Sequence, residues 1–213
     1  MNSYPFSAIL LAAGSSSRMQ GQLKQLLPLP AAGGVDQEPA VRSTARALLT
    51  AGPEELVVVT GHRGRDVMHA LADLPVSFAP NPRHAEGQMT SVMAGLAALR
   101  APCLAVMVCL ADMVLLRPED YRELAWMFSG LPRDAILVPG HGGRRGNPVV
   151  FAASRVPEVL AGNINPGCRK LIEDHPDEVV RVDFEHDRFT CDMDTPEDYA
   201  QARLRISQQH ASA

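Results

Sequence analysis

The sequence predicts an α/β fold built on a mainly parallel β-sheet, and three observations support this prediction. Short apolar runs alternate along the chain with segments of helical periodicity. The runs are apolar throughout rather than at every second position, which is typical of strands buried on both faces. Gly, Pro, Asn and Asp cluster between them, as expected of turns. We therefore expect three layers, with helices on both faces of the sheet and right-handed crossovers.

The elements of the first half follow from these signals in order. An apolar run that ends at Ala13 predicts the first buried strand, and residues 30–39 form a turn-rich surface excursion. A helical pattern over 40–51 ends at Gly52-Pro53, which is a stop signal. The remaining expected elements are a strand at 56–60, a helix ending near 71, a strand at 76–79 and a helix at 88–99.

The second half begins with the most apolar strand, at 104–110, followed by an amphipathic helix over 117–128. Thr195 and Pro196 are good capping residues for a last helix that ends near 206. We predict one domain over residues 1–206 and a disordered tail over 207–213. The other expected elements are strands at 135–138 and 179–184, an antiparallel or edge strand at 149–151, a short helix between 166 and 176, and a segment at 189–194 that pairs with or continues near the strand at 179–184.

Size and composition restrict the function classes. The 213 residues, 46 % of them hydrophobic, suffice for one domain with a sizeable core. A net charge of −4 argues against broad electrostatic binding to nucleic acid. Four cysteines without C-x-x-C or metal-type spacing predict reduced thiols and a cytoplasmic protein. The N-terminal apolar run is too short for a signal peptide or a membrane span, so we expect no membrane partner.

Residues 9–24 (ILLAAGSSSRMQGQLK) predict a buried strand that opens into an anion-binding turn. Backbone N–H groups exposed by Gly14 and the three serines after it can bind anions. Arg18 and Lys24 add full positive charge, which suits a polyphosphate. The stretch matches neither of the two common phosphate-loop patterns, and it lacks the nucleophile-elbow pattern of a hydrolase. On composition alone, an ordinary loop with two solvated cations explains it equally well.

Carboxylates could supply a metal site on the same rim. Asp112 follows a wholly apolar strand, and ligands of open α/β sheets bind at the carboxyl ends of strands. Mg²⁺ typically takes one or two carboxylates plus substrate phosphates. If residues 192–194 are extended, Asp192 and Asp194 face the same side and one could complete the metal shell. The alternatives are turn capping by Asp112 and helix capping by Asp194; capping explains Asp192 less well.

Two further groups carry weaker signals. Cys168 and Arg169 at a helix start could contact a phosphate, although a packed thiol and a surface arginine are equally plausible. His141, Arg144 and Arg145 lie in a glycine-rich loop that could close over an acidic substrate, and a mobile solvated loop explains them as well.

The assembled motifs resemble those of the nucleotidyltransferase family that includes molybdenum cofactor cytidylyltransferase and its guanylyltransferase relative. The match runs in order through nearly the whole chain, so it is more specific than any single motif. The matching residues are 11–19 (LAAGSSSRM), 24–29 (KQLLPL), 81–82, 87–88, 91–92, 110–113 (LADM), 145–149 (RGNPV) with 151, 167–169 with 171–172, 175–177 and 192–199 (DMDTPEDY).

This resemblance implies a single three-layer Rossmann-like nucleotidyltransferase domain with a mainly parallel mixed sheet. It also implies transfer of a nucleotidyl group from an NTP to a phosphate acceptor, here molybdopterin or the molybdenum cofactor, with release of pyrophosphate. Mg²⁺ is the expected cofactor, with Mn²⁺ as a substitute, and a client molybdoenzyme is a conceivable partner. A phosphate-monoester acceptor is largely a dianion at neutral pH, so no general base is required.

The resemblance also assigns roles to residues. The catalytic set is Lys24, Arg18 and Asp112, and the metal ligands are drawn from Asp112, Asp192 and Asp194. The nucleotide-binding set is Leu11, Ala12, Ala13, Gly14, Ser15, Ser16, Ser17, Arg18, Lys24, Gln88 and Ser91. The acceptor-binding set is Arg145, Gly146, Asn147, Cys168 and Arg169, within a wider region that includes Arg144 and Gly167.

Three features depart from the family pattern. Gln20 lengthens the spacing between Arg18 and Lys24 by one residue, and the excursion at 30–39 is longer than usual. Val114 replaces the proline that commonly follows Asp-Met, which loosens the backbone beside Asp112.

The sequence leaves alternatives open for the base of the NTP and for the acceptor. Ala13 stands where the guanylyl branch tends to have glycine, and its methyl group would crowd a larger base, which favours CTP. The alternatives are a nucleotidyltransferase for another phosphorylated acceptor, GTP-dependent or acting on a sugar or polyol phosphate, and a non-catalytic chaperone for the molybdenum cofactor.

Overall fold

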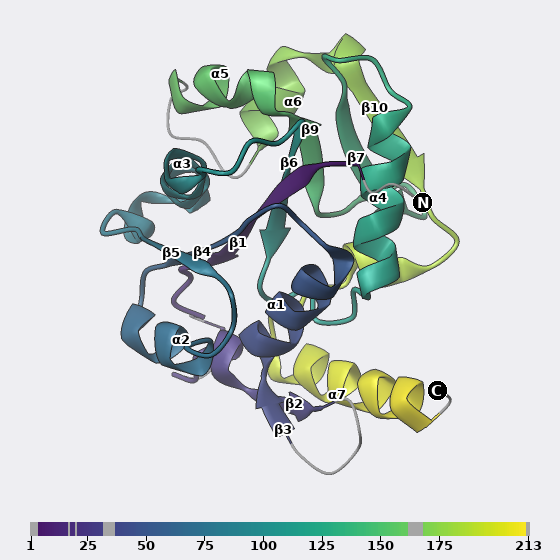
Figure 1. The fold of residues 1–213 in the computed structure, drawn as a ribbon. Coiled ribbons are helices and arrows are strands. Elements are labelled where there is room, and N and C mark those ends of the chain that lie inside the picture. Colours follow the sequence, from purple (N-terminus) through teal and green to yellow (C-terminus); the bar gives the residue numbers. More distant parts are fainter. Residues whose placement is uncertain (1–3, 17, 20, 32–36, 162–167, 212–213) are drawn as a thin grey trace.

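The computed structural model describes residues 4–16, 18–19, 21–31, 37–161 and 168–211 (Figure 1). The described part contains a sheet in the order β10-β7-β9-β6-β1-β4-β5, with β8 paired to β7. The strands are β1 (Phe6–Ala12), β4 (Leu56–Thr60), β5 (Ser77–Pro80), β6 (Ala105–Leu110), β7 (Ile136–His141), β8 (Arg144–Arg145), β9 (Val149–Ala152) and β10 (Val179–Asp183).

The sheet is mainly parallel, as predicted. β1 pairs in parallel with both β4 and β6, β4 with β5, and β7 with β10. β9 runs antiparallel to its two neighbours, β6 and β7, so the expectation for residues 149–151 is confirmed. The parallel core therefore directs the carboxyl ends of β1, β4, β5 and β6 to one edge of the sheet.

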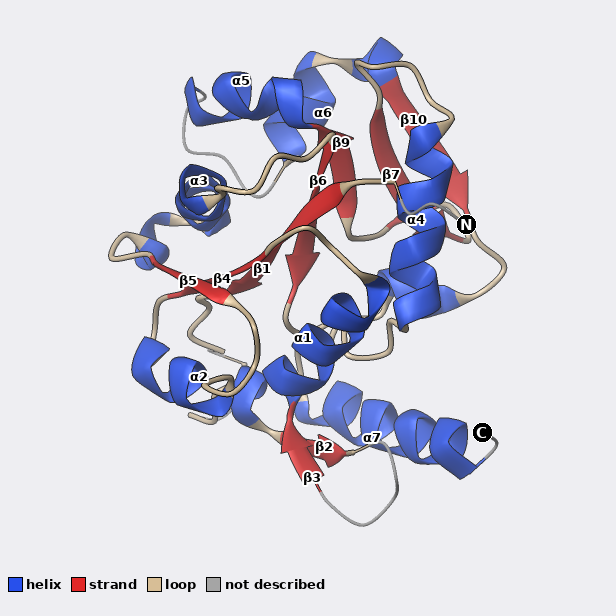
Figure 2. Ribbon diagram, viewed as in Figure 1, coloured by secondary structure: helices blue, strands red, loops and turns tan. Residues whose placement is uncertain are grey.

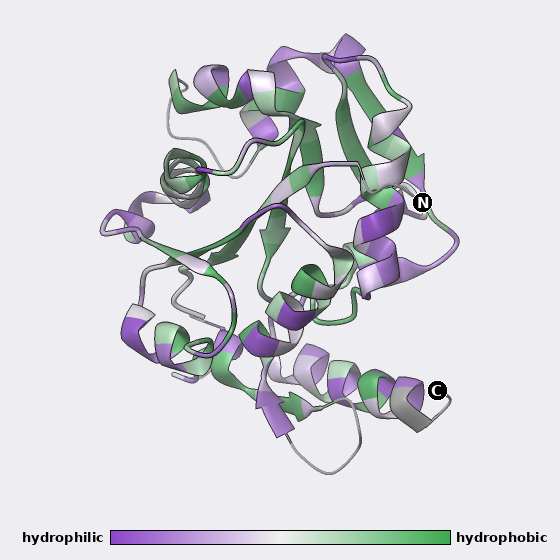
Figure 3. Ribbon diagram, in the orientation of Figure 1, coloured by the Kyte–Doolittle hydropathy of each residue, from purple (hydrophilic) through white to green (hydrophobic). Residues whose placement is uncertain are grey.

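Helices cover both faces of the sheet, which confirms the three-layer fold (Figure 2). α1 (Ala40–Ala51), α2 (Gly64–Ala70) and α4 (Pro118–Ser129) pack on one face, against alternate β1 residues such as Leu10. α3 (Gln88–Ala98), α5 (Val156–Ala161) and α6 (Arg169–Asp174) pack on the other, against residues such as Ile9. Figure 3 shows the apolar colouring concentrated in the central strands.

A third apolar cluster joins the C-terminal helix α7 (Pro196–Ala211) to a small hairpin of β2 (Pro28–Pro30) and β3 (Gln37–Pro39). Leu29 and Met193 are buried in it, and the Tyr199 hydroxyl donates a 2.8 Å hydrogen bond to the Pro28 carbonyl. The cluster holds the end of the chain beside the segment that follows β1 (Figure 1).

Several elements differ from the expectations. The hairpin, β8 and α5 were not predicted, and α7 continues past residue 206 to Ala211. Residues 189–194 do not form a strand: a 3-10 turn covers Asp187–Thr190 and an irregular segment follows. The reason is that Arg205 binds Asp187 and the Phe189 carbonyl accepts from Asn147, so side-chain and loop contacts replace strand pairing. Among the described residues, no helix is both long and apolar enough to cross a membrane.

Candidate active site

The loop after β1 and the residue after β6 meet at one edge of the sheet because these strands are parallel neighbours. The Ala111 N–H donates to the Leu11 carbonyl at 3.2 Å, which fixes where the chain leaves β6. Asp112 therefore emerges beside the loop that carries Arg18 and Lys24. The structure thus brings the two predicted halves of the site together.

Gln25 holds the shape of this loop. Its amide donates to the Gly14 carbonyl at 3.2 Å and accepts from the Ser16 hydroxyl at 3.1 Å, and its side chain is 2 % exposed. The Ser16 hydroxyl also accepts from the Lys24 N–H at 2.9 Å, and Ser16 has a left-handed backbone with φ of 56°. Sequence reasoning missed Gln25; the signal was a glutamine at the start of an otherwise apolar run.

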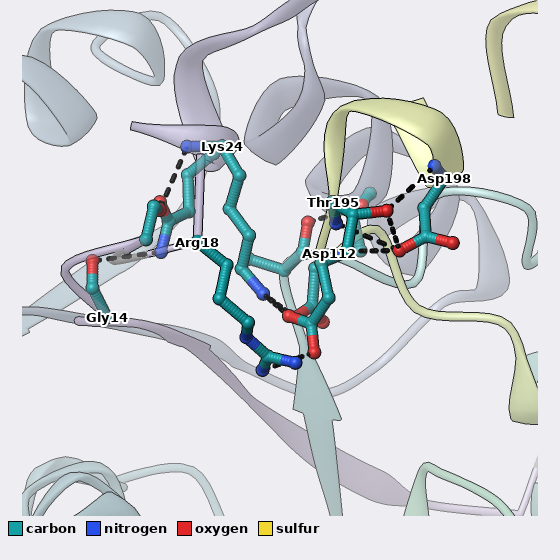
Figure 4. A network of polar contacts seen from close by, with 11 residues as sticks. Gly14, Arg18, Lys24, Asp112, Thr195 and Asp198 are labelled. Carbon is teal, nitrogen blue, oxygen red and sulfur yellow. Dashed lines mark hydrogen bonds and ion pairs between the residues drawn. The ribbon is translucent and has the colours of Figure 1, made fainter. Parts of the chain in front are cut away.

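Lys24 lies between two carboxylates (Figure 4). Its ammonium donates to Asp112 and, at 2.6 Å, to Asp194 Oδ1, while Arg18 contacts the other Asp194 oxygen at 2.5 Å. The Lys24 side chain is only 13 % exposed. Burial by itself disfavours the ammonium, but the negative charges and hydrogen bonds of Asp112 and Asp194 prevail and raise the pKa of Lys24.

Asp194 is held in place by the start of α7. The Asp198 carboxylate accepts from the N–H groups of Asp194 and Thr195 at 3.2 and 2.8 Å, and the Thr195 hydroxyl accepts from the Asp198 N–H at 3.2 Å. The predicted Thr195 cap is therefore present. The Asp194 side chain does not serve this cap, because it faces Lys24 and Arg18 instead.

Asp192 lies near Asp112 and Asp194, but its own side chain is exposed to solvent. Partial desolvation, with further contributions from the charges of Asp194 and Asp112, raises the pKa of its carboxyl group. The Met193 N–H between the two acids donates to the Asp112 carbonyl at 3.1 Å, which ties this segment to the end of β6.

Two of the carboxylates suit a divalent cation. In the described part of the chain, no three His, Cys, Asp or Glu side chains lie close enough to hold a metal by themselves. Asp112 and Asp194 nevertheless converge on one ammonium, and Asp112 Oδ1 is buried without a hydrogen-bond partner among the described residues. Two carboxylates completed by phosphates and water are the usual protein environment of Mg²⁺.

The loops that follow β4 and β5 lie at the same edge of the sheet as the loop after β1. A Cβ added at Gly61 would lie 2.8 Å from the Ala13 methyl group, so these two loops touch. Ala13 is buried (5 % exposed), and its methyl group faces Gly61. Ser91 is buried as well, and its hydroxyl accepts from Asn81 at 2.9 Å, whereas Gln88 is exposed at the start of α3. Sequence reasoning gave Asn81 no role of its own.

The structure places the predicted acceptor residues in different surroundings. Gly146 is packed under the turn at 187–190, where an added Cβ would lie 2.2 Å from the Phe189 carbonyl oxygen. Cys168 is buried, and desolvation raises the pKa of its thiol to about 12, so it does not supply a thiolate. Arg145 lies near Cys168 and Arg169; partial desolvation, helped by the charge of Arg169, lowers its pKa. Ser17, Gln20 and Gly167 lie outside the described residues.

A pocket of about 160 Å³ opens beside Asp112, between β8 and α7. Its walls include Arg144 and Asp192, and Val114 lines it too. Val114 is 7 % exposed and belongs to the apolar cluster of α7, so packing holds the position where the family commonly has proline.

Comparisons with known proteins give matches over most of the chain. The family described as "MobA-like NTP transferase domain" matches residues 8–179. The molybdenum cofactor cytidylyltransferase of Escherichia coli K12 is 28 % identical over 204 residues, which cover 94 % of this chain and 96 % of that protein.

Two solved structures share the fold. A nucleotidyl transferase from Methanothermobacter thermautotroptrophicus superposes with a TM-score of 0.80 at 23 % identity, covering 98 % of this chain and 100 % of that one. The Rv0371c protein of Mycobacterium tuberculosis H37Rv, solved in complex with manganese, gives a TM-score of 0.74 at 20 % identity, covering 94 % and 98 %.

Proposed function

Because the chain belongs to the family of MobA-like NTP transferase domains and is a nucleotidyltransferase, we propose that it transfers CMP from CTP to the terminal phosphate of molybdopterin. The observation that carries the proposal is the convergence of Lys24 and Arg18 with Asp112 and Asp194 on one edge of the sheet. The choice of acceptor and of CTP is supported by the similarity to the E. coli cytidylyltransferase.

In the proposed reaction, the backbone of residues 13–17 and the side chains of Arg18 and Lys24 bind the triphosphate. Asp112 and Asp194 hold Mg²⁺, or Mn²⁺ in its place, and the metal would neutralise charge on the phosphates. Lys24 then exchanges its two carboxylate partners for phosphate oxygens. Asp192 adds negative charge beside the metal ligands and increases their attraction for a cation.

Residues of this site supply alignment and charge neutralisation rather than proton transfer. The acceptor phosphate is already largely ionised at neutral pH, so its oxygen can attack the α-phosphorus without a general base. Negative charge grows on the leaving pyrophosphate, where the Lys24 ammonium can follow it. In the free site Asp112 and Asp194 outweigh desolvation and raise the pKa of Lys24 above its ordinary 10.5, so Lys24 meets the triphosphate as an ammonium.

The direct test is pyrophosphate release by the purified chain with each of the four NTPs, Mg²⁺ and several phosphate acceptors. We expect release with CTP and molybdopterin, and much less with GTP or with sugar and polyol phosphates. Turnover with another pair would assign a different substrate to the same site. Cofactor binding without any pyrophosphate release would favour the chaperone alternative.

A further inference from the structure

We propose that the pocket between β8 and α7 receives the phosphate group of the acceptor, and that Arg144 binds it. The inference rests on the proposed function and extends it to a residue that the family resemblance places only within a wider region. It assigns the acceptor phosphate to Arg144 rather than to Arg145, Cys168 and Arg169, which the resemblance implies.

The position of the pocket fits an acceptor. Asp112 and Asp192 line it on the side of the proposed metal site, Gln201 and Arg205 line it from α7, and Arg144 lines it from β8. Lys24 is not among the lining residues, although it contacts Asp112 directly. Asp112 therefore borders both the proposed triphosphate site and the pocket.

This arrangement suits an in-line displacement. An oxygen of the acceptor phosphate dianion would form a bond to the α-phosphorus, and the bond from that phosphorus to the bridging oxygen would break. The electron pair leaves with pyrophosphate toward Lys24 and Arg18, and no proton needs to be removed. The nucleophile must approach from the side opposite the leaving group. Asp112 lines the pocket whereas Lys24 and Arg18 do not, so an acceptor in the pocket and a pyrophosphate held by these two cations would lie on different sides of Asp112.

Arg144 is the pocket arginine with the fewer partners among the described residues. Its side chain is exposed, its guanidinium makes one long bond of 3.5 Å to the Thr190 carbonyl, and it forms no ion pair with any described residue. Arg205, in contrast, contacts both oxygens of Asp187 at 2.6 and 2.9 Å. A guanidinium fork that lines the same pocket as Asp112 and forms no ion pair with a described residue is well suited to bind a phosphate bidentately.

The neighbouring arginine provides a structural contrast. Successive side chains of a strand point to opposite sides, so Arg144 and Arg145 of β8 face different surroundings. Arg144 reaches the Thr190 carbonyl at the pocket, whereas the charged groups that act on Arg145 are Arg169, Arg181 and Glu173.

Steady-state kinetics with CTP, Mg²⁺ and molybdopterin test the assignment. We expect Arg144→Ala to raise the acceptor KM by roughly tenfold or more, which is the loss of a charged hydrogen bond, with the CTP KM unchanged. Arg144→Lys should recover part of the loss. Arg133→Ala makes the same charge change at the amino end of β7 and should alter neither constant. An unchanged acceptor KM in Arg144→Ala, or a larger rise in Arg145→Ala, overturns the proposal.

A binding measurement separates this inference from the proposed function. If the wild-type chain releases no pyrophosphate with any substrate pair, the proposed function has failed, and phenyl phosphate then serves as the probe. Its binding is followed by NMR with a non-hydrolysable CTP analogue and Mg²⁺ present. Binding that Arg144→Ala weakens roughly tenfold supports the pocket, and no binding, or binding that is independent of Arg144, overturns it.

Discussion

Lys24 is the residue on which most of the site's electrostatics depend. Its ammonium is nearly enclosed and is shared by Asp112 and Asp194, and Arg18 is the second cation on Asp194, so Lys24 is the cation that contacts both partly buried carboxylates. The same position is where a divalent cation and a triphosphate would meet. Two consequences can be measured separately.

The first consequence concerns turnover. Lys24→Ala should lower kcat by roughly 10²- to 10³-fold, with a much smaller change in the KM for CTP, because charge on the pyrophosphate develops in the transition state. Fixed-time assays of pyrophosphate release at saturating CTP measure kcat. An unchanged kcat would remove Lys24 from the mechanism.

The second consequence concerns the metal alone. Lys24→Met removes the cation shared by Asp112 and Asp194 and leaves Arg18 on Asp194, so Mn²⁺ should bind without nucleotide about tenfold more tightly, equivalent to about 1.4 kcal/mol. Electron paramagnetic resonance of free Mn²⁺ reports the affinity. Arg42→Met, which breaks the remote ion pair with Asp73, is the matched control and should change nothing. Equal or weaker binding by Lys24→Met would show that these two carboxylates do not hold the ion.

At the scale of elements, the site depends on how closely the loops after β1 and β4 approach each other. Gly61 is required there because an added Cβ would lie 2.7–2.8 Å from His84 and Ala13 atoms, including the Ala13 carbonyl oxygen. The backbone has to move to accept a methyl group.

Gly61→Ala should therefore destabilise the protein by about 1–3 kcal/mol, the usual cost of overpacking. Urea denaturation measures the free energy of unfolding. Gly130→Ala, where the nearest atom to an added Cβ is 3.7 Å away and φ is −91°, should leave stability almost unchanged. Equal stability of the two variants would contradict the close approach of the loops.

The turn at Asp187–Thr190 connects β10 to the metal-site segment, and α7 secures it. Hydrogen bonds from Arg205 overcome partial desolvation and lower the pKa of Asp187 from 3.8 to about 2. A carboxyl whose folded-state pKa is depressed stabilises the fold above its unfolded pKa, and that stability is lost as the pH falls toward 2.

Asp187→Asn should accordingly unfold more easily than wild type at pH 5, and the gap should close as the pH falls from about 4 to 2. Guanidinium denaturation at several pH values gives the comparison. A gap that stays constant across this range would mean that the Asp187–Arg205 pair contributes nothing through its charge.

At the scale of the whole molecule, the sheet was largely predictable and the small elements were not. Strands such as β1 and β6 are buried on both faces, so their apolar runs identify them without tertiary information. The strands β2, β3 and β8 are two or three residues long and rich in Pro, Gln or Arg, so only their partners make them strands.

Some residues of the candidate site could likewise be proposed from sequence and others could not. Arg18, Lys24 and Asp112 could be proposed from sequence because an anion-binding turn and a strand-end acid have local signatures. Gln25 and Arg144 had weaker signals, a lone glutamine in an apolar run and an arginine in a glycine-rich loop, because a loop clamp and a pocket cation are defined by what the fold places beside them. Phe189 and its turn likewise take their form from contacts with residues far along the chain.

The proposed function requires that the loop of residues 13–24 and Asp112 bind one metal-bound triphosphate. A crystal structure with Mg²⁺ and a non-hydrolysable CTP analogue measures this directly. We predict one Mg²⁺ within about 2.1 Å of oxygens from Asp112, Asp194 and the triphosphate, with Lys24 moved onto a phosphate. A triphosphate bound elsewhere, or a Lys24 that still bridges Asp112 and Asp194 in the complex, would contradict it.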